Sequence, residues 1–308
     1  MSGLDSKTGG RTLGAAWRIA RRHKPHVAFF AAYAAAMALS LLLRNAYGFA
    51  LLFGAICAGA VWLSARHLKL PGHRTLVAEC LFLALAMNVS YEAMAKAVPI
   101  VQGTRFDPVL YRIDIAIWGA SPNVWADQFA NPVLTELMSA CYILFMPLLF
   151  FSLLRYLFWR KGLLAQFYAG LFTVYGLGFL GYLLVPAAGP YLAYPDLFSA
   201  PLVGGPITRL NALMVVEGSN RVDVWPSLHC AVSSFILWFA YRYHRREFWW
   251  LLAPVAGLWV STIYLRYHYF IDIVSGFGLA AFAAWISART ASAGKREEGD
   301  VYAAGLQR

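Results

Sequence analysis

The chain has 308 residues, of which 60% are hydrophobic and only 13% are charged. A soluble domain carries about 25% charged residues, so this composition excludes an ordinary soluble protein and indicates one embedded in a lipid bilayer. The four cysteines lie in apolar runs without paired spacing, which argues against disulfides and against a zinc site.

Residues 1–26 are polar and basic, and we expect a cytoplasmic leader that is disordered or lies on anionic lipid headgroups. The first apolar run after it is too long for a cleavable signal peptide and lacks a small-residue cleavage pattern. A series of apolar runs follows, each near the length that spans a bilayer. They predict an all-α, polytopic membrane helix bundle with about eight transmembrane helices, at 27–43, 46–64, 75–100, 133–158, 163–185, 227–243, 248–265 and 268–288.

The two ends of the chain differ from the middle. Residues 27–64 are predicted to form an accessory transmembrane hairpin, because only the turn at Arg44 and Asn45 joins its two runs. The tail, 289–308, is polar, small and charged, and we expect it to be disordered in the cytoplasm.

The basic residues indicate an orientation. With the N-terminus in the cytoplasm, most of the 26 Lys and Arg residues fall on the cytoplasmic side of the predicted helices. The positive-inside rule therefore predicts a plasma (inner) membrane protein with both termini in the cytoplasm. The net charge of +11 is spread over loop ends and forms no single face for nucleic acid. In this orientation His229 and His268 both begin helices at the extracytoplasmic face, so we expect the site there.

Two extracytoplasmic segments are long. Residues 102–132 hold an amphipathic run broken by Pro, Gly and Asn, with Trp118 and Trp125 suited to the membrane interface. Residues 186–226 contain too much Pro and Gly for a spanning helix. Because a loop of this length in a compact protein is usually functional, we expect 186–226 to cap the site.

The residues that indicate chemistry lie in VWPSLHCA (224–231) and STIYLRYHYFIDIVSG (261–276). The apolar stretch between His229 and His268 suffices for one helix down and one back, at roughly 20 residues per crossing, so both histidines are expected at one depth. Asp272 follows His268 by one helical turn on the same face. A carboxylate that accepts from one ring nitrogen raises the basicity of the other, which makes His268 a candidate nucleophile. His229 is then the candidate general acid and base.

The strings Pro226-Ser227-Leu228-His229 and Ser261…His268…Asp272 resemble the second and third motifs of the type 2 phosphatidic acid phosphatase superfamily. The resemblance covers 75–288 and implies a six-helix catalytic membrane core that uses no metal and no cofactor. It implies that His268 forms a phosphohistidine, that Asp272 orients it and that His229 protonates the leaving group. Ser227 would hydrogen-bond the phosphoryl oxygens, and Ser261 is a further candidate substrate-binding residue.

Two features depart from the superfamily's pattern. Thr262 stands where the third motif has Arg, and the first motif, Lys-x6-Arg-Pro, is absent, its place being taken by VPAAGPYLAY (185–194). This segment, YLRYHYFID and DPVLYRIDIAIWGASP resemble more closely the branch that contains the inositol phosphorylceramide synthases. That branch implies transfer of a phosphorylated headgroup from a lipid donor to a lipid or polyol acceptor, in sphingolipid metabolism. The alternative is a lipid phosphate phosphatase that releases inorganic phosphate.

A phosphoryl site also needs cations or hydrogen-bond donors around the developing charge. Arg221 and Arg266 lie closest in sequence to the two histidines and are candidate substrate-binding residues. Lys96, four residues after Glu92 in a predicted helix, either contacts substrate or pairs with that glutamate. Tyr191 is a candidate for lining a lipid entrance. Further cations on the outer side are Arg105, Arg112 and Arg209.

Two other classes of function stay open. A transporter is compatible with charges inside the membrane, although the sequence carries no internal repeat of the kind many transporters show. A metal enzyme would use His229, His268 and Asp272 as a set of two histidines and one carboxylate.

Overall fold

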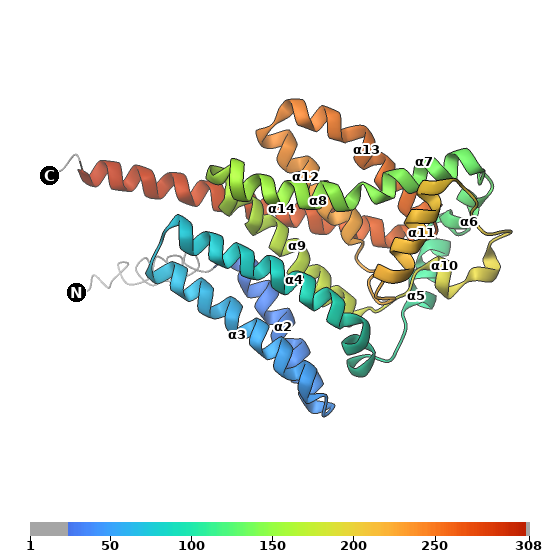
Figure 1. Cartoon of the computed structure of the whole chain (residues 1–308), viewed down its shortest axis with the longest axis horizontal. Coiled ribbons are helices and arrows are strands. Elements are labelled where there is room, and N and C mark those ends of the chain that lie inside the picture. The colour runs from blue at the N-terminus through green and yellow to red at the C-terminus, as the bar shows by residue number, and fades with distance from the viewer. Residues whose placement is uncertain (1–23, 306–308) are drawn as a thin grey trace, which may run out of the picture.

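The computed structural model describes residues 24–305, apart from the side chains from residue 291 onward. The predicted leader, 1–26, therefore lies almost wholly outside the described residues. The described chain is helical throughout and contains no β-strand (Figure 1). The predicted fold class, an all-α polytopic membrane bundle, is confirmed.

Six segments of the described chain are long and apolar enough to cross a membrane. They are α2 (Pro25–Leu43), α3 (Tyr47–Lys69), α4 (His73–Val101), the run through α7 (Pro132–Ile143) and α8 (Phe145–Leu154) to Trp159, the run ending in α9 (Leu164–Leu184), and the first part of α14 (Phe270–Gly305). The other two predicted runs are also helices, α12 (Leu228–Tyr243) and α13 (Arg245–Tyr264). They form a shorter hairpin, since α12 has only 16 residues.

The central helix of the bundle is α9, which contacts α2, α4, α12 and α14. Its glycines permit close approach. A Cβ at Gly176 would collide with the backbone of α2, and one at Gly181 would collide with Pro226, just before α12. Small residues at helix contacts let backbones approach closely in membrane bundles. The hairpin of α2 and α3 is therefore packed directly onto the core, and the start of α12 is fixed against α9.

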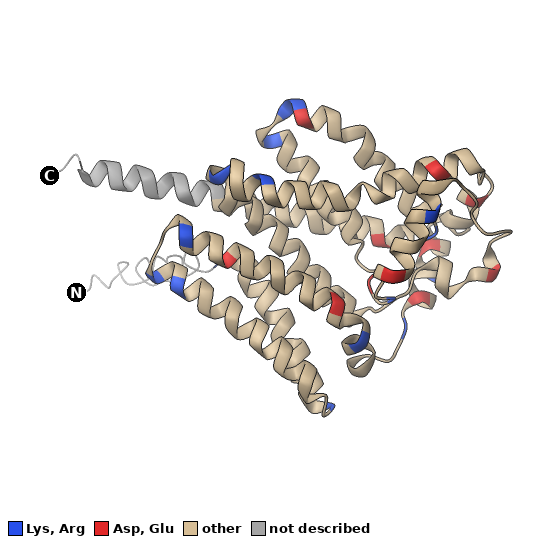
Figure 2. Cartoon of the chain, in the orientation of Figure 1, with Lys and Arg blue, Asp and Glu red and all other residues tan. Residues whose placement is uncertain are grey.

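The short helices gather at the end of the molecule opposite the far end of α14 (Figure 1). Residues 102–132 contain α5 (Asp107–Trp118) and α6 (Pro122–Asp127), and residues 186–226 contain α10 (Pro190–Ala193) and α11 (Pro206–Gly218). Figure 2 shows most of the acidic residues at this end, whereas the opposite end carries many of the Lys and Arg residues. The described charges therefore divide between the two ends of the bundle.

Residues 289–308 were expected to be disordered, and 306–308 lie outside the described residues. In the described part α14 continues to Gly305. Alanine, arginine and glutamate recur in this stretch, and all three are good helix formers.

Candidate active site

The structure brings His229 and His268 together. Nε2 of His268 lies 3.4 Å from Nδ1 of His229. His229 is in the first turn of α12, and His268 lies in the turn that joins α13 to α14. Because α12 packs against both α13 and α14, the hairpin of α12 and α13 brings the chain back to His229 when it reaches His268.

The other ring nitrogen of His268 faces oxygen atoms. Nδ1 lies 3.1 Å from the carbonyl oxygen of Val224 and 3.5 Å from Oδ2 of Asp272. Both oxygens are acceptors, so Nδ1 carries the ring proton and Nε2 presents its lone pair toward His229. The same carboxylate oxygen of Asp272 accepts a hydrogen bond of 2.8 Å from the amide of Tyr269. Asp272 is thereby held in place beside the ring.

His268 is almost fully buried, with 3% of its surface exposed. Burial lowers the pKa of its imidazole to about 4, against smaller opposing effects of Asp223 and of the Val224 carbonyl. The ring is therefore neutral near pH 7, which is the form that a nucleophile requires.

A cavity of about 100 Å³ opens beside the two imidazoles. This is room for several water molecules or for a polar group of similar size. One side is formed by the histidines and by Tyr142 and Tyr267, whose rings lie 4.8 Å apart. The segment 186–226 also contributes to the lining, with Tyr191, Asn211, Met214, Val215, Gly218, Ser219 and Asp223.

A comparison with protein families agrees with this geometry. Residues 108–286 match the family model described as the PAP2 superfamily. The chain belongs to the PAP2 superfamily. Members of this superfamily are phosphatases and phosphotransferases, so the chain is a membrane enzyme of that type. Neither the search of curated proteins nor that of solved structures found a match.

The PAP2 motif serines are both fully buried and lie outside the wall of the cavity. Ser227 is the N-cap of α12, and its Oγ accepts a hydrogen bond of 3.3 Å from the amide of Cys230. Ser261 donates a hydrogen bond of 2.7 Å to the carbonyl of Leu258. In this conformation both hydroxyls bind the protein's own backbone and do not face a substrate.

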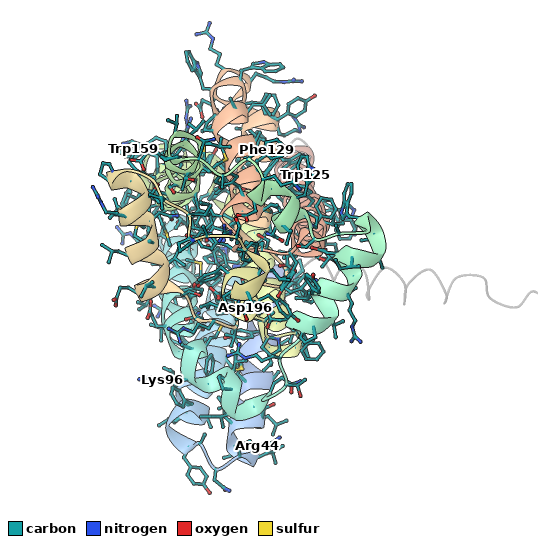
Figure 3. All side chains as sticks on the ribbon, turned by 90° about the vertical axis from the view of Figure 1, so that its right-hand side faces the viewer. Arg44, Lys96, Trp125, Phe129, Trp159 and Asp196 are labelled. Carbon is teal, nitrogen blue, oxygen red and sulfur yellow. The ribbon has the colours of Figure 1, made fainter. Side chains whose placement is uncertain are left out.

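The predicted cations also lie away from the cavity. Arg266 forms an ion pair with Asp127, donates to the carbonyl of Ala200 at 2.9 Å and stacks over the ring of Phe198. Arg221 and Lys96 are exposed, and Lys96 lies at the edge of the molecule in Figure 3, which faces this end. Within the described chain no lysine or arginine lines the cavity, and no ion pair joins Lys96 to its neighbour Glu92.

Residues 102–132 hold the backbone around His268, a role that the sequence analysis missed. The side-chain amide of Asn123 donates to the carbonyls of Ile263 and His268 at 2.9 and 3.0 Å. Asp114 accepts from the amides of Phe270 and Ile271 at 2.7 and 3.0 Å, and so caps α14 from a distant part of the chain. The signal was present in DPVLYRIDIAIWGASPN, where polar residues interrupt an apolar run.

Asp107, in the segment 102–132, binds both the segment 186–226 and the turn that holds His268. Its Oδ1 accepts hydrogen bonds from the amide of Gly189 at 2.9 Å and from the hydroxyl of Tyr269 at 3.0 Å. Gly189 has φ of +89°, a conformation that favours glycine. The backbone that replaces the first PAP2 motif is therefore anchored next to His268.

No group of three or more His, Cys, Asp and Glu side chains among the described residues converges in a way that would hold a metal ion. The arrangement of His229, His268 and Asp272 is instead a chain of ring nitrogens and one carboxylate. It suits proton transfer and nucleophilic attack.

Proposed function

We propose that this PAP2 protein transfers a phosphorylated group from a lipid donor to a lipid or polyol acceptor through a phosphohistidine on His268. The observation that carries the proposal is the pair of contacts at that ring. Nδ1 is bound to the Val224 carbonyl and lies near Asp272, whereas Nε2 carries the lone pair and lies 3.4 Å from Nδ1 of His229.

In the first step, the lone pair of Nε2 of His268 attacks phosphorus, an N–P bond forms and the P–O bond to the leaving group breaks. His229 gives a proton to the departing oxygen. Because burial lowers the pKa of its imidazole to about 3, the negative charge of the bound phosphoryl group has to favour the protonated form first. In the second step the acceptor hydroxyl loses its proton to His229, its oxygen bonds to phosphorus and the N–P bond breaks. The carboxylate of Asp272 stabilises the positive charge that His268 carries as the phosphohistidine.

We favour transfer over hydrolysis because Met214 and Val215 of α11 contribute apolar side chains to the lining of the cavity, which makes it less favourable for water. We expect 186–226 to act as the cap that restricts water. The alternative is a lipid phosphate phosphatase, in which water takes the place of the acceptor hydroxyl in the second step.

The site is proposed to face the extracytoplasmic side of the plasma membrane. The support is the division of charge between the two ends of the bundle (Figure 2), since basic residues mark the cytoplasmic side. Membership of the inositol phosphorylceramide synthase-like branch, with a sphingolipid acceptor, belongs to the same proposal and rests on the motif strings alone.

The test is mass spectrometry of products from purified protein given lipid donors with and without an acceptor. A phosphorylated acceptor with little free phosphate supports the transferase, and free phosphate with an unchanged acceptor supports the phosphatase. His268→Ala and His229→Ala should each abolish turnover, whereas His73→Ala, an exposed histidine at the opposite end, should retain it. Full activity in both site variants would overturn the proposal, as would substrate flux across liposomes without any product.

A further inference from the structure

The cavity beside the histidines has an unpaired carboxylate in its wall. Asp223 is half-buried there and accepts hydrogen bonds from the hydroxyl of Tyr91 at 2.5 Å and from that of Ser219 at 3.4 Å. No lysine, arginine or histidine pairs with it in the described part of the chain. A carboxylate in a partly buried cavity is stable only when its charge is compensated.

Aromatic rings surround the same space. Tyr91, Tyr142, Tyr191 and Tyr267 all line the cavity. The ring of Tyr267 lies 4.8 Å from that of Tyr142 and 5.2 Å from that of Tyr191, so these three rings form one continuous cluster. Aromatic faces attract cations and commonly bind quaternary ammonium groups. Aromatic rings together with a carboxylate that forms no ion pair among the described residues are suited to a positively charged ligand.

We propose that Asp223, Tyr91 and the cluster of Tyr142, Tyr191 and Tyr267 form a subsite for the ammonium group of a cationic headgroup. The ammonium group belongs either to the headgroup of a zwitterionic donor phospholipid or to an amino-alcohol acceptor. This inference rests on the proposed function, because it places the phosphorus of the substrate at His268.

The charges explain why such a subsite is needed. Phosphoryl transfer brings negative charge to His268, in a cavity that Asp223 shares. Since like charges repel in a poorly solvated site, a substrate with an anionic or neutral headgroup leaves that repulsion uncompensated. An ammonium group a few bonds from the phosphorus lies between the two negative charges and offsets both. The same carboxylate thus attracts a cationic headgroup and rejects an anionic one.

The turnover test compares donors that differ only in headgroup charge, phosphatidylcholine and phosphatidylethanolamine against phosphatidylglycerol. A second arm fixes the donor and compares choline and ethanolamine with glycerol as acceptors, which tells the two sources of the ammonium group apart. We expect a preference of at least tenfold in kcat/KM for the cationic partner in one arm. Asp223→Asn should remove that preference, whereas Glu217→Gln, the same change at an exposed position of α11, should preserve it. Equal use of cationic and neutral partners in both arms by the wild type would overturn the subsite.

A binding test does not depend on turnover. Choline and its neutral isostere 3,3-dimethylbutan-1-ol are titrated into the wild-type protein in detergent by calorimetry. The subsite predicts at least tenfold tighter binding of choline, with loss of the difference in Asp223→Asn. Equal or absent binding of the two probes contradicts it. If choline binds and no lipid is turned over, the subsite stands and the proposed function fails. If lipids are turned over without charge preference and choline does not bind, the proposed function stands and the subsite fails.

Discussion

The side-chain amide of Asn123 donates a hydrogen bond of 3.0 Å to the backbone carbonyl of His268. Its second bond, to the carbonyl of Ile263, crosses the turn that carries the histidine. Asn123 is fully buried, so no water replaces it. Helix α6, far away in the sequence, therefore fixes the backbone of the proposed nucleophile.

Replacing Asn123 by alanine should lower kcat more than it raises KM, because His268 loses its position while the substrate cavity is kept. The carbonyl of His268 loses its donor, and a buried group left unsatisfied costs about 1–3 kcal/mol of stability, whereas the carbonyl of Ile263 keeps the amide of Arg266. Steady-state kinetics and thermal unfolding in detergent measure both effects. Asn131→Ala is the matched control, since that side chain bonds only to its neighbours Phe129 and Leu134. An unchanged kcat in Asn123→Ala would show that the loop does not position the ring.

Asp114→Ala should destabilise the fold by about 1–2 kcal/mol, the usual effect of losing a helix cap. The amides of Phe270 and Ile271, at the start of α14, would be left without their acceptor. The measurement is the thermal unfolding midpoint compared with that of Asp196→Ala. Asp196 is exposed and labelled in Figure 3, and its removal should change the midpoint little. Equal midpoints for the two variants would be inconsistent with a capping role.

Arg266 and Asp127 should behave as a structural pair. In a double-mutant cycle with Arg266→Ala and Asp127→Ala we expect a coupling energy of about 0.5–3 kcal/mol in thermal unfolding, as for other contacting residues. The guanidinium contacts Asp127, Ala200 and Phe198. Arg266→Ala should therefore lower the stability of the fold but leave KM for the phosphorylated donor nearly unchanged. Additive effects on stability, with a large rise in KM in Arg266→Ala alone, would instead make Arg266 a substrate-binding residue.

The pH dependence of the first step should reflect the buried imidazole. Protonation of His268 removes its nucleophilic lone pair, and burial lowers its pKa to about 4 from the ordinary 6.5. The rate of attack should therefore persist as the pH falls through 6.5 and decline only toward about 4. A single-turnover assay with an aryl phosphoester measures this, because an aryl leaving group needs no proton from His229. A midpoint near 6.5 would contradict a buried, neutral nucleophile.

The same shift links pH to stability. The unfolded chain binds a proton at the imidazole below about 6.5, whereas the folded chain binds it only near 4. The unfolded state therefore binds more protons between these values, and His268 makes the fold less stable as the pH falls through this window. His268→Asn, which does not titrate, should flatten that part of the stability profile.

The helices and the pairing of the histidines could be predicted from the sequence because both depend on lengths. Apolar runs of bilayer length predict helices, and the run from His229 to His268 is long enough to leave a membrane face and return to it. The four-residue spacing of Asp272 from His268 predicts that the two side chains meet on one face of a helix. In the structure His268 precedes α14, and its Nδ1 still lies 3.5 Å from Oδ2 of Asp272. These relationships are local or follow from a single hairpin.

The hydrogen-bond partners of the segment 102–132 could not be predicted in this way. Asn123 and Asp114 bind backbone groups that are remote in sequence, and such pairs are decided by tertiary packing. The same holds for Ser227 and Arg266, whose types suggested substrate contacts. In the structure Ser227 is a helix cap that accepts from a backbone amide, and Arg266 donates to Asp127. Buried polar side chains usually find such hydrogen-bond partners within the protein.

The central claim is that His268 becomes covalently phosphorylated, and the most direct test is to trap that species. His229→Asn is mixed with an aryl phosphoester donor, whose leaving group needs no acid, so the first step proceeds while the second lacks its base. Intact-protein and peptide mass spectrometry at alkaline pH should then show the transferred phosphoryl group on His268, and none in a variant that also carries His268→Asn. A variant that releases the aryl alcohol without any modified His268 would contradict the account.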